Sequence, residues 1–297
     1  MIYTHRKEQN QMDVNQLLGS KTVIFDGAMG TMLQEKGLEP GTLPELMNLK
    51  APDVVLAIHQ GYRSAGAQII TANTFGAHEL RLKDTGFTVE EVIDAGVSLA
   101  KEAAGSEALV ALDIGPLGVL LEPYGTLKFA DAYQYLKRQA EQGQKSGADI
   151  ILIETMADLE EVKAAVLAAR ENTDLPVFCT MSFEAHHRTF MGCTVESMVR
   201  VLEELGAAAV GANCSLGPQE LEPVVDSLLE LTDLPVIVQP NAGLPKMEQG
   251  KAVYELTCEE FAAYGLRFAE KGVKILGGCC GTSYQHIKAL AEQIRGG

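Results

Sequence analysis

Short apolar runs alternate with longer amphipathic segments along nearly the whole chain. Eight of these runs consist of β-branched or aliphatic residues and are apolar throughout, which is typical of parallel strands covered on both faces. They lie near residues 23, 69, 110, 150, 177, 209, 236 and 274. The pattern therefore predicts eight buried strands at similar intervals.

Between the strands, apolar residues recur at three-and-four spacing with charge on the other side, as in amphipathic helices. We assign helices to residues 52–66, 89–105, 158–171, 195–206, 221–232, 258–272 and 286–297. This alternation predicts a single-domain α/β fold, the (β/α)8 TIM barrel, over residues 16–297, after a polar N-terminal tail over residues 1–15. A doubly wound open sheet is the alternative, but "DGAMG" after the first run is not the GxGxxG turn that it needs.

Composition narrows the possible partners. The chain has 297 residues, of which 46% are hydrophobic and 22% charged, as in soluble globular proteins. Its net charge is −16 and it has no basic run, so we expect no nucleic acid partner. No apolar stretch reaches membrane-spanning length and the N-terminus lacks the apolar core of a secretion signal, so we expect no membrane association and a cytoplasmic location.

In such a barrel the active site lies at the C-terminal ends of the strands, so the residues that follow each apolar run are the candidates. These residues are Asp26, Gly27, Asn73, Asp113, Glu154, Ser182, Asn213, Cys214, Asn241, Cys279 and Cys280. Polar groups and thiols therefore gather where this fold carries out its chemistry.

The stretch "GGCCGT" places Cys279 beside Cys280 after the eighth run. Adjacent cysteines bond to each other only through a strained ring, so a structural disulfide explains them poorly. Cys214 follows the sixth run, close enough in a barrel to face this pair. Three thiolates suit Zn²⁺ and leave a fourth position for solvent or substrate. Inert burial is the other interpretation, and we adopt it for Cys179 and Cys258.

Six short motifs occur in order at successive strand ends: "FDGAMGTMLQ", "NTFGA", "DIGP", "GANCSLGP", "PNAG" and "GGCCGT". Together they resemble the zinc-dependent homocysteine S-methyltransferase family. "NLKAPDVV" and "NAGLPKMEQGKAVYEL" resemble, within that family, the N-terminal homocysteine-binding barrel of cobalamin-dependent methionine synthase. The likeness runs from about residue 16 to the C-terminus.

The resemblance implies a ligand set for the metal. Cys214, Cys279 and Cys280 match the zinc ligands of the family, and Asn241 matches a position that can occupy the fourth zinc site when substrate is absent. Homocysteine would bind there through sulfur and lose its thiol proton. Because three protein thiolates already make the centre a weak Lewis acid, they favour alkylation of sulfur over the water activation that suits histidine ligands.

The resemblance also implies contacts to the amino acid head group of homocysteine. Asp26, Gly27 and Glu154 match positions around that group, and Asn73 and Asn213 complete the expected substrate-binding set. Residue chemistry agrees, because an ammonium attracts carboxylates and a carboxylate attracts the backbone N–H groups of a Gly-rich turn. For Asp26 a helix cap is an alternative role.

The predicted function is zinc-dependent methylation of homocysteine to methionine. The resemblance implies methylcobalamin as donor, and because the DxHxxG corrinoid motif is missing, we expect it on a separate corrinoid module or protein. The chain would then be an excised module or a stand-alone subunit. Betaine is disfavoured because it calls for an aromatic cage: the chain has no Trp, and Gly76 and Thr155 stand where the betaine branch has tyrosines.

Three alternatives remain open at this point. The first is a cobalamin-independent homocysteine S-methyltransferase that uses S-methylmethionine or a similar donor. The second is a non-catalytic module that binds homocysteine or zinc. The third is a barrel aldolase or isomerase, which would use a lysine or paired carboxylates, and the strand ends lack a lysine.

Overall fold

The computed structural model describes residues 14–19, 22–39, 41–248 and 251–296, and its central feature is a closed ring of parallel strands. The strands are β1 (Val23–Ile24), β2 (Ile69–Thr71), β3 (Leu109–Ile114), β4 (Ile150–Met156), β5 (Val177–Met181), β6 (Ala209–Asn213), β7 (Val236–Gln239) and β10 (Ile275–Leu276). They pair in the order β1-β10-β7-β6-β5-β4-β3-β2, and a bridge between Phe25 and Ile69 joins β1 to β2. The predicted (β/α)8 barrel is confirmed.

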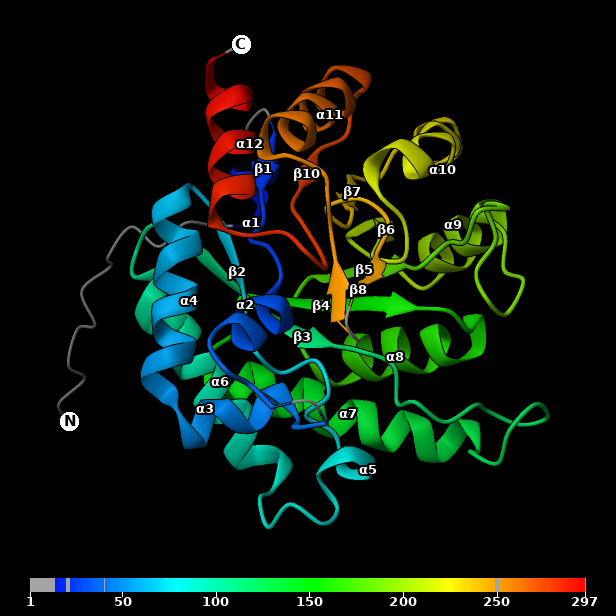
Figure 1. The fold of residues 1–297 in the computed structure, drawn as a ribbon. Helices are drawn as coiled ribbons and strands as arrows, with labels where there is room; N and C mark the ends of the chain where they lie inside the picture. The colour runs from blue at the N-terminus through cyan, green and yellow to red at the C-terminus, as the bar shows by residue number, and fades with distance from the viewer. Residues whose placement is uncertain (1–13, 20–21, 40, 249–250, 297) are drawn as a thin grey trace, which may run out of the picture.

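Helices surround this ring on the outside (Figure 1). The long helices are α4 (Pro52–Ala65), α6 (Val89–Ala104), α7 (Phe129–Ser146), α8 (Leu159–Asn172), α9 (Val195–Glu204), α10 (Pro218–Leu231), α11 (Cys258–Lys271) and α12 (Tyr284–Gly296). The short ones are α1 (Val14–Gly19), α2 (Met29–Glu35), α3 (Met47–Lys50), α5 (Glu79–Leu82) and the 3-10 helix η1 (Pro44–Leu46). An antiparallel hairpin, β8 (Lys246–Glu248) and β9 (Lys251–Val253), lies between β7 and α11.

Helix α7, the β8–β9 hairpin and the short helices α1, α2, α3, α5 and η1 were not predicted from the sequence. Helix α7 lacks a clear apolar spacing, because its buried face includes Gln139, Gln142 and Gly143 beside a few apolar residues. The β8–β9 hairpin lies in a polar stretch that carries no strand pattern. Most of the predicted tail, residues 1–13, lies outside the described residues, and helix α1 begins at Val14.

Side-chain alternation along the strands divides the core into two clusters. One contains Phe25, Ile69, Leu109 and Ile150, which point into the ring, and the other contains their sequence neighbours, which pack against the helices. Successive inward positions are two residues apart. Continuing from Leu109 and Ile150 by two steps of two residues leads to Asp113 and Glu154, at the C-terminal end of the barrel.

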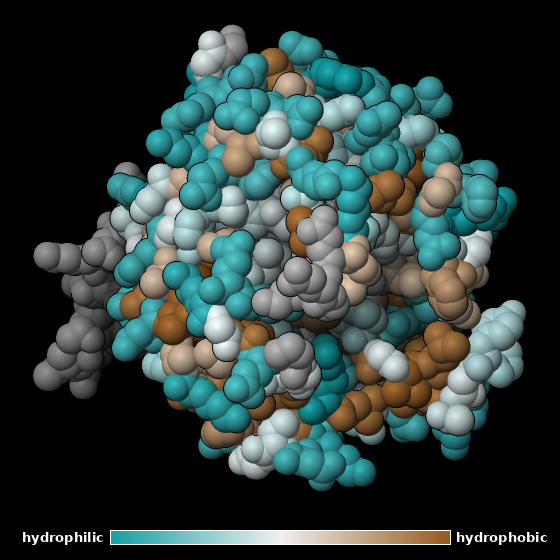
Figure 2. Space-filling view, in the orientation of Figure 1, coloured by the Kyte–Doolittle hydropathy of each residue, from teal (hydrophilic) through white to brown (hydrophobic). Residues whose placement is uncertain are grey.

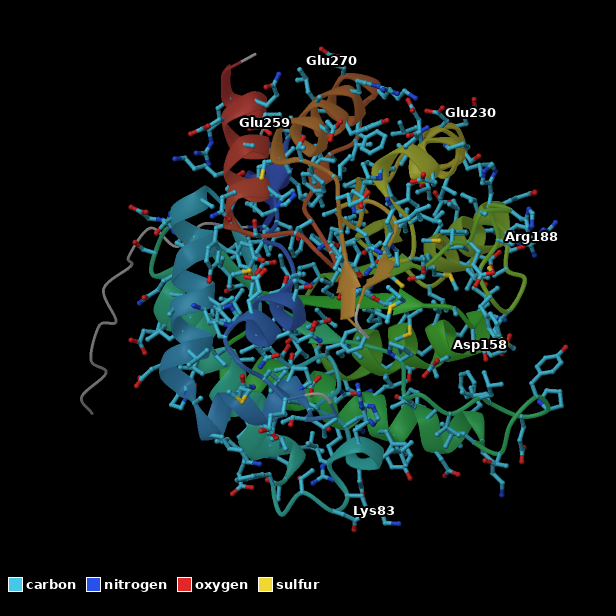
Figure 3. All side chains as sticks on the ribbon, in the orientation of Figure 1. Lys83, Asp158, Arg188, Glu230, Glu259 and Glu270 are labelled. Atoms are coloured by element: carbon cyan, nitrogen blue, oxygen red, sulfur yellow. The ribbon has the colours of Figure 1, made fainter. Side chains whose placement is uncertain are left out.

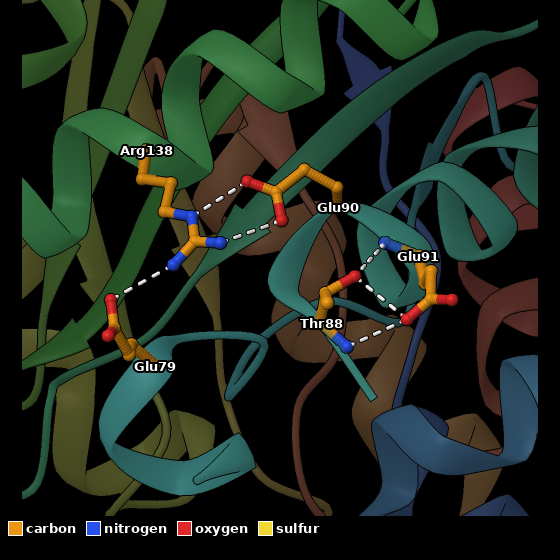
Figure 4. Close-up of polar contacts among 5 residues, drawn as sticks. All are labelled: Glu79, Thr88, Glu90, Glu91 and Arg138. Atoms are coloured by element: carbon orange, nitrogen blue, oxygen red, sulfur yellow. Dashed lines mark hydrogen bonds and ion pairs between the residues drawn. The ribbon is translucent and has the colours of Figure 1, made fainter. Parts of the chain in front are cut away.

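The loop after β2 is tied to two helices by one arginine. Arg138 of α7 donates to both carboxylate oxygens of Glu90 in α6, at 2.7 and 2.8 Å, and to Glu79 of α5 at 3.0 Å (Figure 4). Thr88 and Glu91 form a capping box at the start of α6. Exposed ion pairs contribute little to stability, but a bidentate pair fixes geometry. The network therefore holds α5 in place at the rim of the barrel.

Charged side chains lie at the surface of the molecule. The labelled side chains of Lys83, Arg188, Glu230 and Glu270 lie at the periphery in Figure 3. Figure 2 shows a mostly hydrophilic face with apolar groups gathered at its lower right, where the segment before α7 runs in Figure 1. Among the described helices, none has the length and apolar character needed to cross a membrane.

Candidate active site and metal centre

A pocket of about 410 Å³ opens at the C-terminal ends of the strands. Of the residues predicted from sequence, it brings together Asp26, Gly27, Asn73, Asp113, Glu154, Cys214, Cys279 and Cys280. Its walls also contain Glu45, Thr71, Phe75, Arg81 and Gln239. Asn213 and Asn241 are buried beside it and are not part of its lining.

Three cysteine sulfurs form a compact cluster in one wall. The Sγ atoms of Cys214, Cys279 and Cys280 all lie within 4.8 Å of one another, and those of Cys214 and Cys280 are 3.9 Å apart. Tetrahedral zinc with Zn–S bonds near 2.3 Å places its sulfurs about 3.8 Å apart. Within the described ranges, this is the one group of three His, Cys, Asp or Glu residues placed to hold a metal. The spacing fits zinc.

The backbone around the sulfurs is tightly constrained. Cys214 and Ser215 have left-handed φ angles of 59° and 56°. This conformation costs about 1–2 kcal/mol per non-glycine residue, and such strain is typical of functional sites. On the other side, the Cys279 amide donates to the Pro240 carbonyl at 2.8 Å, and the Ala242 amide donates to the Cys280 carbonyl at 2.9 Å. The turn after β6 and the β7–β10 pairing therefore set the positions of the three sulfurs.

Asn241 has a buried side chain with an unpaired oxygen. The side chain is 2% exposed, and its Oδ1 atom has no hydrogen-bond partner among the described residues. Its backbone amide donates to the Leu216 carbonyl at 3.0 Å, which ties it to the turn that follows Cys214. A buried carbonyl oxygen without a hydrogen bond is costly, so this atom is available as a donor to a metal ion. The donor set of three sulfurs and one amide oxygen suits a tetrahedral metal.

Hydrogen bonding within the sulfur cluster shifts the pKa values of the thiols in opposite directions. Hydrogen bonds from Cys214 and Cys279 lower the pKa of Cys280 to about 3, against the effect of burial. The same network, through Cys214 and Cys280, raises the pKa of Cys279 well above its ordinary value. The pKa shifts thus favour negative charge on Cys280 within the cluster, and thiolate sulfur is a preferred ligand of soft metal ions.

Carboxylates occupy other walls of the pocket. Burial raises the pKa of Asp26 to about 7, and burial together with the charge of Asp26 raises the pKa of Glu154 to about 8. Burial and the charge of Glu154 also raise the pKa of Asp113. Buried acids of this kind are stabilised by a cationic ligand, because burial removes the water that would otherwise solvate their negative charges.

Asp26 is anchored by a neighbouring strand. Its two carboxylate oxygens accept hydrogen bonds from the Thr71 amide at 2.8 Å and from Thr71 Oγ1 at 2.7 Å. It does not cap helix α2, whose N-cap residue is Ala28 and which has no side-chain cap. The helix-cap alternative for Asp26 is therefore wrong, and its carboxylate lies in the pocket wall.

The two asparagines expected to contact substrate have different surroundings. Asn213 is fully buried, and its Oδ1 accepts hydrogen bonds from the Thr155 amide at 2.8 Å and from Thr180 Oγ1 at 2.7 Å. Asn73 lines the pocket, while its Nδ2 donates to the Pro44 carbonyl at 2.8 Å. Asn213 thus supports the backbone next to Glu154 from behind the pocket wall.

Some lining residues carried no sequence signal. Glu45 lies in η1, where one carboxylate oxygen accepts from the Gly76 amide at 2.6 Å and the other has no partner. Arg81 lies in α5 at the rim. Neither residue follows an apolar run, so the strand-end rule could not find them. Gln239 is the last residue of β7 and lies two residues before Asn241, which the rule did select.

Comparisons with known proteins agree with this geometry. The family model described as homocysteine S-methyltransferase matches residues 23–294. Methionine synthase of Mycobacterium tuberculosis (strain ATCC 25618 / H37Rv) is 34% identical over 308 residues, covering 95% of this chain and 25% of that protein. Methionine synthase of Mycobacterium leprae (strain TN) is 31% identical over 310 residues, covering 97% of this chain and 26% of that protein. The chain spans about a quarter of the length of these curated relatives.

The fold is also found among solved structures. The homocysteine methyltransferase MmuM from Escherichia coli, in its metallated form, superimposes with a TM-score of 0.81 at 22% sequence identity. The match covers 94% of this chain and 99% of that chain, which shows that the two share one barrel. Since the family model covers nearly the whole chain, the protein belongs to the homocysteine S-methyltransferase family.

Proposed function

We propose that this chain binds zinc, takes up homocysteine at the open zinc position and methylates its sulfur to give methionine, with methylcobalamin on a separate corrinoid module as donor. The observation that carries the proposal is the sulfur cluster of Cys214, Cys279 and Cys280, whose spacing suits tetrahedral zinc beside a pocket walled by carboxylates. Membership of the family supports homocysteine as acceptor.

The three cysteines would hold the metal, and Asn241 Oδ1 would occupy its fourth position until substrate enters. Zinc, when bound, supplies the acidity that removes the proton from the substrate thiol. The protein sulfurs would bring negative charge to the centre and keep the substrate sulfur electron-rich. Asn241 would stay in its turn whether or not its side chain binds the metal, because its backbone amide donates to the Leu216 carbonyl.

Carboxylates beside the sulfurs would bind the ammonium group of homocysteine. Glu154 is partly exposed in the pocket, and Asp113 has an Oδ1 atom that is buried without a partner. Asp26 keeps its place through Thr71 and adds negative charge. A cation among these acids relieves their mutual repulsion and stabilises their ionised forms. Gly27 lets the backbone pass close to Thr282, since a Cβ atom at residue 27 would lie 2.6 Å from Thr282 Oγ1.

Two observations bear on the methyl donor. Phe75 is the one aromatic residue among the lining of the pocket in the described chain, so the walls offer no aromatic cage for a quaternary ammonium donor such as betaine. The curated relatives are methionine synthases of which this chain covers about a quarter, which supports a donor carried elsewhere. S-methylmethionine is the second candidate donor, because the acidic pocket also suits a small cation.

Methionine formation with four donors in parallel tests the proposal: methylcobalamin, a methylated corrinoid protein, S-methylmethionine and betaine. We expect the highest rate with the corrinoid protein, because orientation of the methyl carbon can supply roughly 7 kcal/mol or more of the barrier and free methylcobalamin lacks it. Dominant use of S-methylmethionine would place the chain in the cobalamin-independent branch. Homocysteine binding without turnover from any donor would make it a binding module.

A further inference from the structure

Thr282 lies where two turns of the pocket wall meet. Its side chain is fully buried and is not part of the pocket lining. One turn, residues 26–28, follows β1, and the other, residues 278–280, follows β10 shortly before Thr282. Because β1 and β10 are paired strands, their turns are neighbours at the C-terminal end of the barrel, and both turns line the pocket.

The Thr282 hydroxyl joins the two turns. Its Oγ1 atom accepts a hydrogen bond from the Ala28 amide at 3.1 Å and donates to the Cys279 carbonyl at 2.7 Å. The hydroxyl thus uses its acceptor function on one turn and its donor function on the other. A valine has the same shape but neither function.

Two glycines make room for this side chain. A Cβ atom added to Gly27 would lie 2.6 Å from Thr282 Oγ1, and one added to Gly278 would lie 2.6 Å from both Oγ1 and Cγ2 of Thr282. Since real Cβ atoms do not approach so closely, a side chain at either position would displace Thr282 or the turn. The two turns therefore leave a space that the Thr282 side chain fills.

Other contacts hold the junction in addition to Thr282. The Tyr62 hydroxyl of α4 lies 2.9 Å from the Ala28 carbonyl and 3.3 Å from the Thr282 carbonyl. The Gly278 amide donates to the Asp26 carbonyl at 3.0 Å, a backbone bond that does not involve Thr282. Loss of the Thr282 hydroxyl should therefore loosen the junction without opening the barrel.

Under the proposed function the two turns bind opposite ends of one substrate. Cys279 and Cys280 belong to the metal centre that takes the sulfur, and Asp26 and Gly27 belong to the wall that takes the amino acid head group. A ligand gains affinity from a second contact only if the two contact points are correctly spaced. The group that fixes this spacing should therefore affect homocysteine more than a thiol that binds through sulfur alone.

We propose that Thr282 is a positioning residue that fixes the metal centre relative to the turn for the amino acid head group, and that it thereby favours homocysteine over thiols without such a group. The inference rests on the proposed function, which assigns the sulfur to the metal and the head group to residues 26–28. It requires no particular methyl donor. Thr282→Val removes both hydrogen bonds and keeps the shape, whereas Thr282→Ser retains the hydroxyl.

Thiol titrations of the cobalt(II)-loaded protein, followed through the thiolate-to-cobalt absorption, test this role. Homocysteine is compared with propanethiol, which has the same sulfur and carbon chain without the amino and carboxyl groups. Thr282→Val should bind homocysteine roughly fivefold more weakly, the equivalent of about 1 kcal/mol for one hydrogen bond, and should bind propanethiol as wild type does. Thr282→Ser should restore homocysteine affinity.

Thr173→Val is the matched control, because the Thr173 hydroxyl donates to the Ala169 carbonyl at 2.7 Å just after α8, away from the pocket lining. If Thr282→Val does not fold, Tyr62→Phe, which removes the hydroxyl bound to the Ala28 carbonyl, should show the same selective loss. Equal losses for the two thiols, or no loss for either, would overturn the inference. Failure of wild type to bind homocysteine at cobalt would instead refute the proposed function, and this inference with it.

Discussion

The Thr155 amide donates to Asn213 Oδ1 at 2.8 Å, and Asn213 Nδ2 donates back to Thr155 Oγ1 at 2.7 Å. Thr155 has a left-handed φ angle of 61° and directly follows Glu154. These two hydrogen bonds let the Asn213 side chain of β6 fix the backbone at the end of β4. They thereby also fix the position of the Glu154 carboxylate in the pocket.

Asn213→Ala should lower both stability and homocysteine affinity. The substitution leaves the Thr155 amide without its acceptor in a partly buried site, which costs about 1 kcal/mol of unfolding free energy. Urea unfolding and calorimetric titration with homocysteine measure the two effects. Asn172→Ala is the control, because Asn172 is half-buried on α8 and away from the pocket. A loss no larger than that of the control would contradict the supporting role of Asn213.

Serine variants test the metal ligands. Wild type should contain about one zinc per chain, and Cys214→Ser, Cys279→Ser and Cys280→Ser should each lose most of it, because a hydroxyl is a poor substitute for a thiolate. Cys258→Ser, at the start of α11, should retain the full amount. Elemental analysis after gel filtration checks this. Zinc at the wild-type level in both Cys279→Ser and Cys280→Ser would exclude the site.

Glu154→Gln should weaken homocysteine binding while leaving zinc in place. The amide keeps the size of the side chain but loses the charge that would pair with the ammonium group. Since hydrogen bonds to charged groups contribute about 1.5–3 kcal/mol, affinity should fall roughly tenfold to a hundredfold. Glu184→Gln, in the exposed loop after β5, is the control. Wild-type affinity in Glu154→Gln would remove Glu154 from the substrate site.

Stability should depend on pH through Glu161, outside the pocket. Burial raises the pKa of Glu161 from 4.5 to about 7, although its Oε1 accepts from the Leu117 amide at 2.7 Å. Between these two values the folded state binds more protons than the unfolded state, so the unfolding free energy falls as pH rises through this window and stays lower above it.

Glu161→Gln should remove this contribution, because an amide oxygen can still accept the Leu117 hydrogen bond without carrying charge. The variant should gain on the order of 1–3 kcal/mol over wild type above pH 7 and nothing near pH 4. Urea unfolding across pH measures the difference, with Glu160→Gln on the exposed side of the same helix as control. A constant gain at all pH values would exclude titration of Glu161 as its cause.

The polar residues at the strand ends could be predicted, because each of them lies at the end of the apolar run that defines its strand. Asp113 and Glu154 continue the inward positions of β3 and β4, and the cysteines follow β6 and β10. Glu45 and Arg81 lie in short helices within loops, and their position depends on how those loops fold over the barrel.

Asp26 also has a place in the closure of the barrel. Strands β1 and β2 meet through the single bridge of Phe25 and Ile69, and the Asp26 carboxylate accepts the Thr71 amide where a further backbone acceptor would continue the ladder. A side chain in the pocket wall thus completes the seam of the ring. If Asp26 binds the ligand as proposed, ligand binding and closure of the ring are linked equilibria. A ligand that orders Asp26 then strengthens the contact between β1 and β2, and weakening this contact lowers ligand affinity by the same free energy.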